Sequence, residues 1–382
     1  MPTWLIFLLL LSVLVLVHEL GHFLAARILG IGVEEFAFGL PFTKPLIKIR
    51  LGGTQYAIYP VLFGGFVRLA GEEGQEPGKS GEEKEYRKKS YWYRGKKQRL
   101  AVLLAGVFMN ILLALTAFTV LYWKVGIPIR QKDKITLVQV GENSPAAVSG
   151  LEAGDRVTEI EGREVSDIDE FVTLVKSWSG VGVNLTIQKG TGTPLFEGIA
   201  EGRIEQRVVN IVPRANPPEG EGALGVVLAV YPYLETEYCS LTSPSCVAKS
   251  VTQGFKTTGM WIGRVTEGLR DIGRSLVKGK APEGVAGPVG IYQLTGIIAA
   301  EGWLPLLELV AILSVNLGVF NVLPIPALDG GRVAFVIGEW VLKKRVRPET
   351  EQKINSWGMA FLIGLMVLVS LQDVIRLFFS AK

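Results

Sequence analysis

Four long apolar segments stand out along the chain, separated by stretches of mixed and charged residues. Each has roughly the 20 residues that an α-helix needs to cross a bilayer core. The first is uncharged up to Val17, and the second carries no charged side chain at all. We therefore predict an α-helical polytopic membrane protein with four transmembrane helices, at residues 1–29, 100–123, 303–323 and 357–379.

A cleaved signal peptide is the alternative interpretation of the first segment. Its start, Met1-Pro2-Thr3-Trp4, lacks the basic side chain typical of signal peptides, and the apolar stretch continues into a polar motif of catalytic type. These two features favour a retained helix.

Charge distribution predicts how the helices are oriented. Lys and Arg gather in the connection at residues 30–99 and again between the third and fourth helices. Basic residues in short loops mark the cytoplasmic side of a membrane. We therefore expect both basic loops in the cytoplasm, with both chain ends and the long segment from about Lys124 to Gly302 outside.

Composition agrees with a membrane protein, because 48% of the 382 residues are hydrophobic and the net charge is only +4. The basic residues flank apolar segments and form no aromatic-interleaved run, so we expect no nucleic-acid partner. A metal transporter would need more polar groups along the spans than this chain has.

The only two histidines, His18 and His22, lie four residues apart at the end of the first apolar segment. On a helix this spacing directs both imidazoles to one side. With Glu19 between them they form the H-E-x-x-H arrangement of zinc hydrolases, in which the glutamate is the general base. Ionisable groups in an apolar helix are costly unless paired or metal-bound, which favours a metal site.

A catalytic zinc usually has three protein ligands, and no third histidine is available. The best candidate is Asp329, which follows the third apolar segment. Pro324 and Pro326 prevent a regular helix there, so the backbone must open before Asp329. In the predicted orientation, Asp329 and the histidines lie at matching depth toward the cytoplasm. A simple turn before Gly330-Gly331 is the alternative role for Asp329.

These two motifs together resemble the site-2 protease family of intramembrane zinc metalloproteases, in its bacterial branch with a single extracytoplasmic PDZ domain. The resemblance covers nearly the whole chain. It implies one catalytic Zn²⁺ bound by His18, His22 and Asp329, with Glu19 as catalytic base. Pro324, Pro326, Gly330 and Gly331 would shape the active-site loop.

The resemblance also implies substrate-binding or oxyanion-stabilising roles for Asn110 and Asn321. Asn110 ends a stretch in which the family commonly has Gly-Pro-x-x-Asn, but this chain has Val107 in place of the proline. Hydrogen bonding between helices is the alternative role for both amides.

Two segments outside the spans carry further predictions. Short strands at Ile47–Leu51, Tyr56–Pro60 and Gly64–Leu69 are expected from their glycine turns, and the family implies a membrane-associated β-element that offers a strand edge to substrate.

The run from Gly141 to Val157 resembles an α+β PDZ domain, followed by a helix around Asp169–Lys176. Such a domain could bind peptide or act as a size filter.

The region after the PDZ domain contains a Pro- and Gly-rich linker, a short run at Gly222–Val226 that could supply a further strand, and apolar residues at helical spacing from Val251 onward. We interpret the segment from Val251 onward as an amphipathic helix on the membrane surface or against the PDZ domain, with ordinary packing as the alternative.

Cys239 and Cys246 lie on the predicted outer side of the membrane. Their spacing is compatible either with a disulfide or with two free thiols.

We therefore expect an intramembrane zinc endopeptidase of the bacterial inner membrane that cuts single-span membrane proteins, of the anti-sigma factor or remnant signal peptide type. A proteolytically inactive PDZ-containing membrane adaptor is the alternative. The expected organisation is a first helix at 1–29, a cytoplasmic loop with the β-element at 30–99, a second helix at 100–123, a PDZ domain at 133–213, a linker with the amphipathic helix at 214–302, a third helix with the metal-ligand loop at 303–332 and a fourth helix at 357–379.

Overall fold

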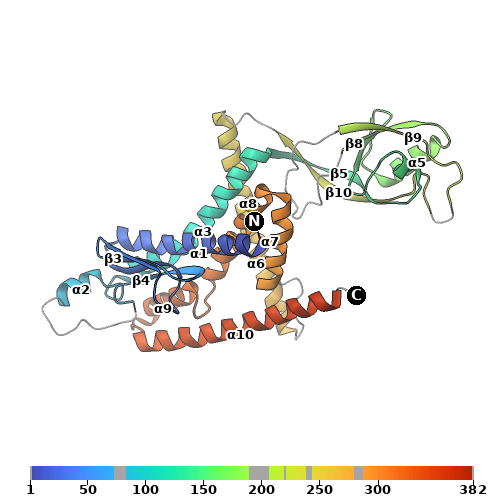
Figure 1. Ribbon diagram of the computed structural model, residues 1–382. Helices are drawn as coiled ribbons and strands as arrows, with labels where there is room; N and C mark the ends of the chain where they lie inside the picture. Colours follow the sequence, from blue (N-terminus) through green and yellow to red (C-terminus); the bar gives the residue numbers. More distant parts are fainter. Residues whose placement is uncertain are drawn as a thin grey trace. The chain divides into compact units, whose positions relative to one another are not determined.

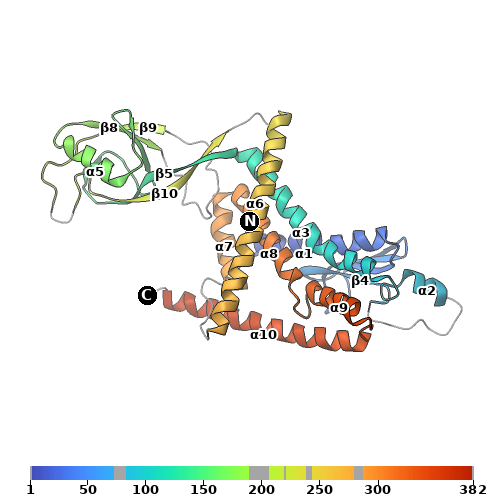
Figure 2. The same ribbon diagram turned by 180° about the vertical axis from the view of Figure 1, so that it is seen from behind.

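The computed structural model describes residues 2–72, 83–188, 206–218, 221–237, 243–278 and 287–380. The chain divides into two compact units (Figures 1 and 2). Unit 1 comprises Met1–Thr119 and Val251–Lys382, and unit 2 comprises Val120–Ser250.

Among the described residues, four helices are long and apolar enough to cross a membrane, which confirms the four predicted segments as helices of this kind. The fourth has no buried side chains over its most apolar window, as expected of a helix that faces lipid. The second begins before its apolar stretch, because Gly95 accepts the first hydrogen bonds and the intervening basic residues are good helix formers. The helices are α1 (Thr3–Ile28), α3 (Lys96–Val125), α8 (Trp303–Val322) and α10 (Pro348–Ser380).

A four-stranded sheet follows α1 in the order β2-β3-β1-β4. Strand β1, the first of the four along the chain, was not expected from the sequence, because Glu34 and Glu35 interrupt its apolar pattern. Glu35 is nevertheless buried, where it accepts hydrogen bonds from Tyr59 and Gln55. The strands are β1 (Val33–Leu40), β2 (Ile47–Leu51), β3 (Thr54–Ile58) and β4 (Val61–Leu69).

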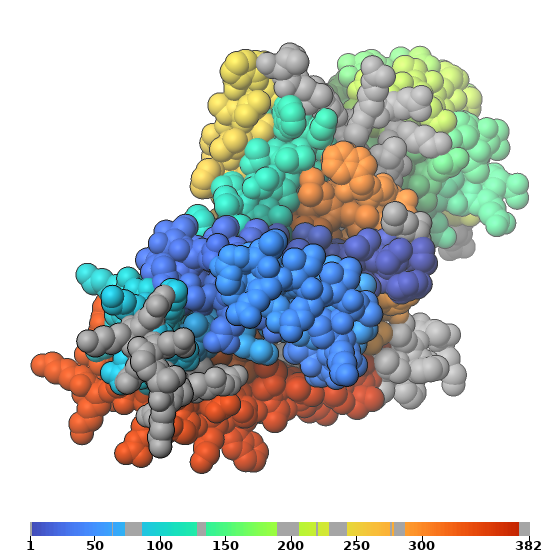
Figure 3. All heavy atoms as spheres, turned by 60° about the vertical axis from the view of Figure 1, so that its left-hand side comes forward, coloured from blue at the N-terminus to red at the C-terminus, as the bar shows by residue number. Residues whose placement is uncertain are grey.

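Strand β4 forms one edge of this sheet and packs along α1. Figure 3 shows residues of the sheet, in light blue, lying against the dark blue α1. The helix that carries the two histidines therefore has a strand edge beside it.

The remaining helices assigned wholly to unit 1 are short. They are α2 (Glu83–Lys89), α7 (Pro288–Glu301) and α9 (Asp329–Leu342). The predicted amphipathic segment lies in the long helix α6 (Pro244–Val277), and α7 packs against α1, α8 and α10.

Unit 2 contains a six-stranded antiparallel sheet in the order β10-β5-β6-β8-β9, with β7 paired to β6. Its core includes Ile135, Leu137, Phe171 and Leu185. The elements are β5 (Ile127–Val140), α4 (Pro145–Val148), β6 (Arg156–Ile160), β7 (Arg163–Glu164), α5 (Ile168–Ser177), β8 (Val183–Gln188), β9 (Gln206–Ile211) and β10 (Val226–Glu237).

This sheet extends beyond the range of 133–213 given to the PDZ domain. Strand β5 begins at Ile127, and β10, which lies in the segment interpreted as a linker, pairs with it along its length. Only the start of this strand was expected, from the run Gly222–Val226. Pro232 is tolerated within it because β10 is an edge strand, and an edge tolerates a residue without an N–H.

Of the two cysteines, Cys246 is fully buried and disulfide-bonded. Cys239 lies outside the described residues.

Candidate metal centre

His18 and His22 both lie on α1, two turns before its end at Ile28. The uninterrupted apolar sequence keeps this segment helical, and the spacing of four residues puts the two imidazoles on the same side. Both are largely enclosed, since their side chains are only 9% and 11% exposed. Two imidazoles so far from water need partners other than solvent.

Asp329 comes from a different part of the chain, the first residue of α9. Helix α8 ends at Val322, and the segment with Pro324 and Pro326 is irregular. Its turn passes through Ala327, whose φ is +77° and whose N–H donates to Asn355 Oδ1 at 3.2 Å. The predicted opening of the backbone before Asp329 is confirmed.

Gly330 allows this loop to fold closely over the start of α9. A Cβ at this position would lie 2.1 Å from the carbonyl oxygen of Leu323, and one at Gly331 would lie 2.5 Å from that of Ile325. Real Cβ atoms do not approach carbonyl oxygens so closely, so any side chain here would push Asp329 out of place.

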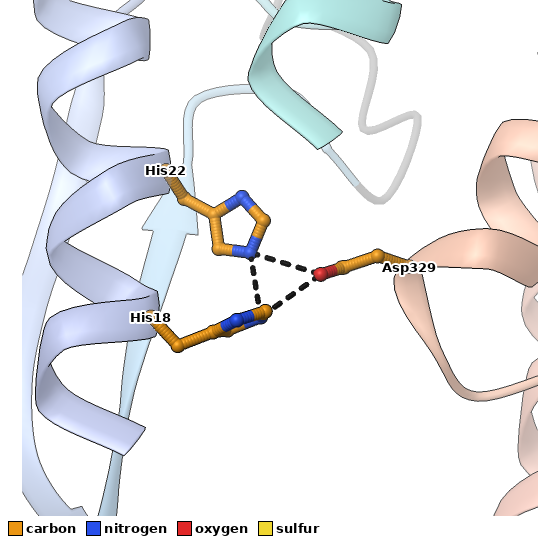
Figure 4. A group of neighbouring side chains, drawn as sticks. All are labelled: His18, His22 and Asp329. Carbon is orange, nitrogen blue, oxygen red and sulfur yellow. Dashed lines mark hydrogen bonds and ion pairs between the residues drawn. The ribbon is translucent and has the colours of Figure 1, made fainter. Parts of the chain in front are cut away.

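The three side chains point toward one another, as Figure 4 shows. His18 Nε2 lies 2.9 Å from Asp329 Oδ2, and His22 Nε2 lies 3.1 Å from the same oxygen. The two Nε2 atoms are 3.1 Å apart. Two nitrogens and a carboxylate oxygen from residues 311 positions apart thus converge on one point.

The surroundings of His22 determine which of its nitrogens can bind a metal. Its Nδ1 lies 2.9 Å from the carbonyl oxygen of Val102 on α3, which can only accept a hydrogen bond. Nδ1 must therefore carry the proton, and Nε2 presents a lone pair toward Asp329 and His18.

Gly106 on α3 keeps the space in front of the imidazoles open. A Cβ at this position would lie 2.5 Å from His22 Nε2 and 2.6 Å from His18 Cε1. Only glycine leaves room for both rings and for anything that they hold. The functional importance of Gly106 was missed in the sequence, although a glycine within an apolar helix is a recognisable signal of close approach.

Asn110 lies behind His18, fully buried, with its Nδ2 3.1 Å from His18 Nδ1. Its Oδ1 is also buried and has no hydrogen-bond partner among the described residues. Turning the amide by half a turn would let Oδ1 accept a proton from His18 Nδ1, since the two ends of an amide have nearly the same shape. His18 Nε2 would then also present a lone pair, as a metal ligand must.

Glu19 faces the sheet. Its Cγ lies 3.9 Å from the place that a Cβ on Gly65 of β4 would occupy. Its carboxylate interacts electrostatically with both histidines and with Asp329. Glu19 therefore lies between the converging ligand atoms and the strand edge.

An ion pair joins the end of β4 to the start of α9. Glu72 accepts a hydrogen bond from the Leu69 N–H at 3.1 Å and pairs with Arg332, three residues after Asp329. The carboxylate of Glu72 raises the pKa of Arg332 above its ordinary value, so the guanidinium stays charged. This pair ties the end of β4 to the helix that begins with Asp329, and it was not predicted from the sequence.

Comparison with known proteins shows the family. The profile of Peptidase family M50 matches residues 6–365. This chain belongs to peptidase family M50. The match includes both halves of the converging site, from His18 to Asp329.

Relatives of this M50 peptidase share its full length. A Clostridium perfringens protein named "Putative zinc metalloprotease" is 33% identical over 366 residues, covering 95% of this chain and 96% of its own. The zinc metalloprotease RasP of Bacillus licheniformis is 27% identical and covers 99% of this chain and all of its own. The PDZ domain of the SdrC-like protein of Listeria monocytogenes is 26% identical over 25% of this chain and 86% of its own, with a TM-score of 0.19.

The M50 peptidase is thus a zinc metalloprotease of the membrane, and its converging side chains fit that ion. Ligand atoms held at zinc bond lengths in a tetrahedron lie roughly 3.3 Å from one another. The separations of 2.9–3.1 Å between the two Nε2 atoms and Asp329 Oδ2 are slightly shorter.

The structure does not bring every predicted site residue into this cluster. Asn321 is buried near the end of α8, and no hydrogen bond of its side chain is seen among the described residues. Its role as a substrate or oxyanion ligand stays a prediction.

Proposed function

We propose that this M50 peptidase hydrolyses peptide bonds within the membrane, and that His18, His22 and Asp329 hold its zinc. One observation carries the proposal: the three ligand atoms lie within 4.8 Å of one another, in a unit built around helices of membrane-spanning length. A soluble metalloprotease does not need a helix of membrane-spanning length to carry two of its metal ligands.

The roles of the side chains follow from their positions. Bound zinc lowers the pKa of a water ligand and polarises the substrate carbonyl. Glu19, beside the ligands on α1, takes the proton from the attacking water and passes it to the departing amine. Of the two amides, Asn110 is committed to His18, and contact with the substrate is proposed for Asn321.

The free edge of β4 is proposed as the place where the substrate binds. A transmembrane helix cannot be cut while its backbone is hydrogen-bonded to itself, so it must first unwind. An unwound segment could pair with the outer edge of β4 as an added strand. Glu19 lies against this strand, which would bring the paired backbone to the ligand cluster.

The proposed substrates are single-span membrane proteins, such as anti-sigma factors or remnant signal peptides, in a bacterial inner membrane. The basic loops are assigned to the cytoplasm, and unit 2 to the outside. Unit 2 is proposed to be the PDZ domain, on the strength of its motif at residues 144–155 and its antiparallel sheet with α5. There it would act as a filter that admits only shortened substrates.

The test is cleavage of a single-span reporter embedded in vesicles with the purified protein. The Glu19→Gln variant should lose activity by at least roughly 100-fold, the usual contribution of a general base. Glu301→Gln, an exposed carboxylate at the end of α7, is the matched control and should cleave normally. Equal cleavage by wild type and Glu19→Gln would contradict the assignment of Glu19 as the base, and no cleavage by wild type would favour the inactive adaptor.

A further inference from the structure

A second polar site lies in unit 1, separate from the converging ligands. It is a pocket of about 610 Å³ lined by four basic side chains, Arg87, Lys88, Lys89 and Arg94. We call it the basic pocket. No carboxylate lines it among the residues that the structure describes, and Glu34, which interacts with Tyr86 of α2, lies outside it.

The basic pocket gathers four basic side chains within a few residues of one another. Within the described ranges, neither Lys88 nor Arg94 is paired with a carboxylate. Arg94 instead donates to the backbone carbonyl of Gly30, and its Nε has no acceptor. Arg87 is held with its guanidinium 5.0 Å from the centre of the Tyr93 ring. Like charges held together in this way favour binding of an anion.

Backbone groups add to this preference. Gly95 and Gln98 line the pocket, so the first turn of the 30-residue helix α3 lies at its wall. The N–H groups at the start of a helix carry partial positive charge.

The pocket lies where two membrane-spanning helices end. Gly30 follows the last turn of α1, and Gly95 precedes the first turn of α3. The apolar stretches of both helices begin within a few residues of it, which is the depth of lipid headgroups. Ile28 and Phe108, on the same two helices, are 83% and 65% exposed and offer surface to acyl chains.

We propose that the basic pocket binds the phosphate of an anionic lipid headgroup. A guanidinium and ammonium groups beside a helix start are the donors that phosphate prefers. A headgroup held there would fix the end of α1, which carries both histidines, against the start of α3, which carries Gly106 and Asn110. The inference does not depend on the proposed substrates.

The test uses the full chain in nanodiscs of phosphatidylcholine with and without phosphatidylglycerol, followed by native mass spectrometry of the retained lipid. Wild type should retain phosphatidylglycerol in preference to phosphatidylcholine. The double variant Arg87→Gln/Lys88→Gln should bind it more weakly, by about fivefold for each charge removed. The matched control Lys343→Gln/Lys344→Gln removes the same charge from an exposed loop outside the pocket and should bind as wild type does.

Three results would overturn the proposal. Equal retention by wild type and the Arg87/Lys88 variant would show that the pocket does not bind the lipid. Equal loss in the Lys343/Lys344 control would show that only overall charge matters. Displacement of the lipid by millimolar inorganic phosphate would identify a site for free phosphate instead. A circular dichroism spectrum unchanged between variants would establish that each is folded.

Discussion

At the scale of residues, the ligand cluster depends on groups that do not bind the zinc ion themselves. The carbonyl of Val102 sets the tautomer of His22, and Asn110 would set that of His18 with its amide turned so that Oδ1 faces Nδ1. Such partners hold a ligand ring in place and keep its metal-binding nitrogen unprotonated. We therefore regard Asn110 as a positioning residue for His18.

Replacing Asn110 tests this directly. Asn110→Leu fills the same space without an acceptor, so zinc affinity should fall by about 10–100-fold. Asn110→Asp keeps an acceptor for His18 Nδ1 and should restore much of that affinity. Zinc retained against a chelator of known affinity is the measurement.

Asn316 provides the control. Its amide bonds the Ile312 carbonyl within α8, so Asn316→Leu should retain zinc as wild type does. If Asn110→Leu also retains zinc normally but cleaves poorly, the amide serves the substrate rather than His18.

The sequence predicted the ligand candidates at this scale because few alternatives existed. With only two histidines, any histidine site had to include His18 and His22. The supporting residues could not be predicted in the same way. Val102 acts through its backbone carbonyl, and Gly106 acts through the absence of a side chain, so neither carries a chemical signature.

At the scale of elements, α9 must be held firmly because its first residue is Asp329. Arg99 at the start of α3 pairs with Glu339 of α9 at 2.9 Å, and both side chains are only 1% exposed. The guanidinium also lies 5.0 Å from the Trp92 ring. A pair this deeply buried cannot be broken without leaving a charge uncompensated.

Glu339→Leu should therefore destabilise the protein by about 3–5 kcal/mol, because Arg99 would be left buried and unpaired. The double variant Arg99→Met/Glu339→Leu should recover most of this loss. The measurement is the midpoint of unfolding in detergent. Breaking the exposed pair of Arg163 and Glu170 should cost about 1 kcal/mol or less. An unchanged midpoint in Glu339→Leu would contradict the structural role of the pair.

Elements with one dominant pattern were predictable, and those with mixed patterns were not. Long uncharged runs predicted the spanning helices, and the motif around Ser144 predicted the strand-turn-strand region of unit 2. Strand β1 was missed because the burial of Glu35 depends on Tyr59 and Gln55, which come from β3 and the turn after it. Strand β10 was expected only at its start, because the edge position that tolerates Pro232 is a property of the finished sheet.

At the scale of the whole molecule, the account requires the two basic loops and unit 2 to lie on opposite sides of the membrane. Single cysteines at Lys344 and Glu142 can report this. A membrane-impermeant maleimide should label Glu142→Cys in intact spheroplasts and Lys344→Cys only after lysis. The protein without an added cysteine is the control and should not be labelled, because Cys246 is disulfide-bonded. The reverse labelling pattern would contradict the assigned orientation.

The central claim is that His18, His22 and Asp329 bind zinc while Glu19 acts on the bound water. The most direct test is to measure the zinc content of the purified wild type and variants, because this distinguishes zinc binding from the action of Glu19 on the bound water. We predict about one zinc per chain in wild type and in Glu19→Gln. His22→Ala and Asp329→Ala should lose it. Full zinc occupancy in Asp329→Ala, or loss of zinc in Glu19→Gln, would contradict the account.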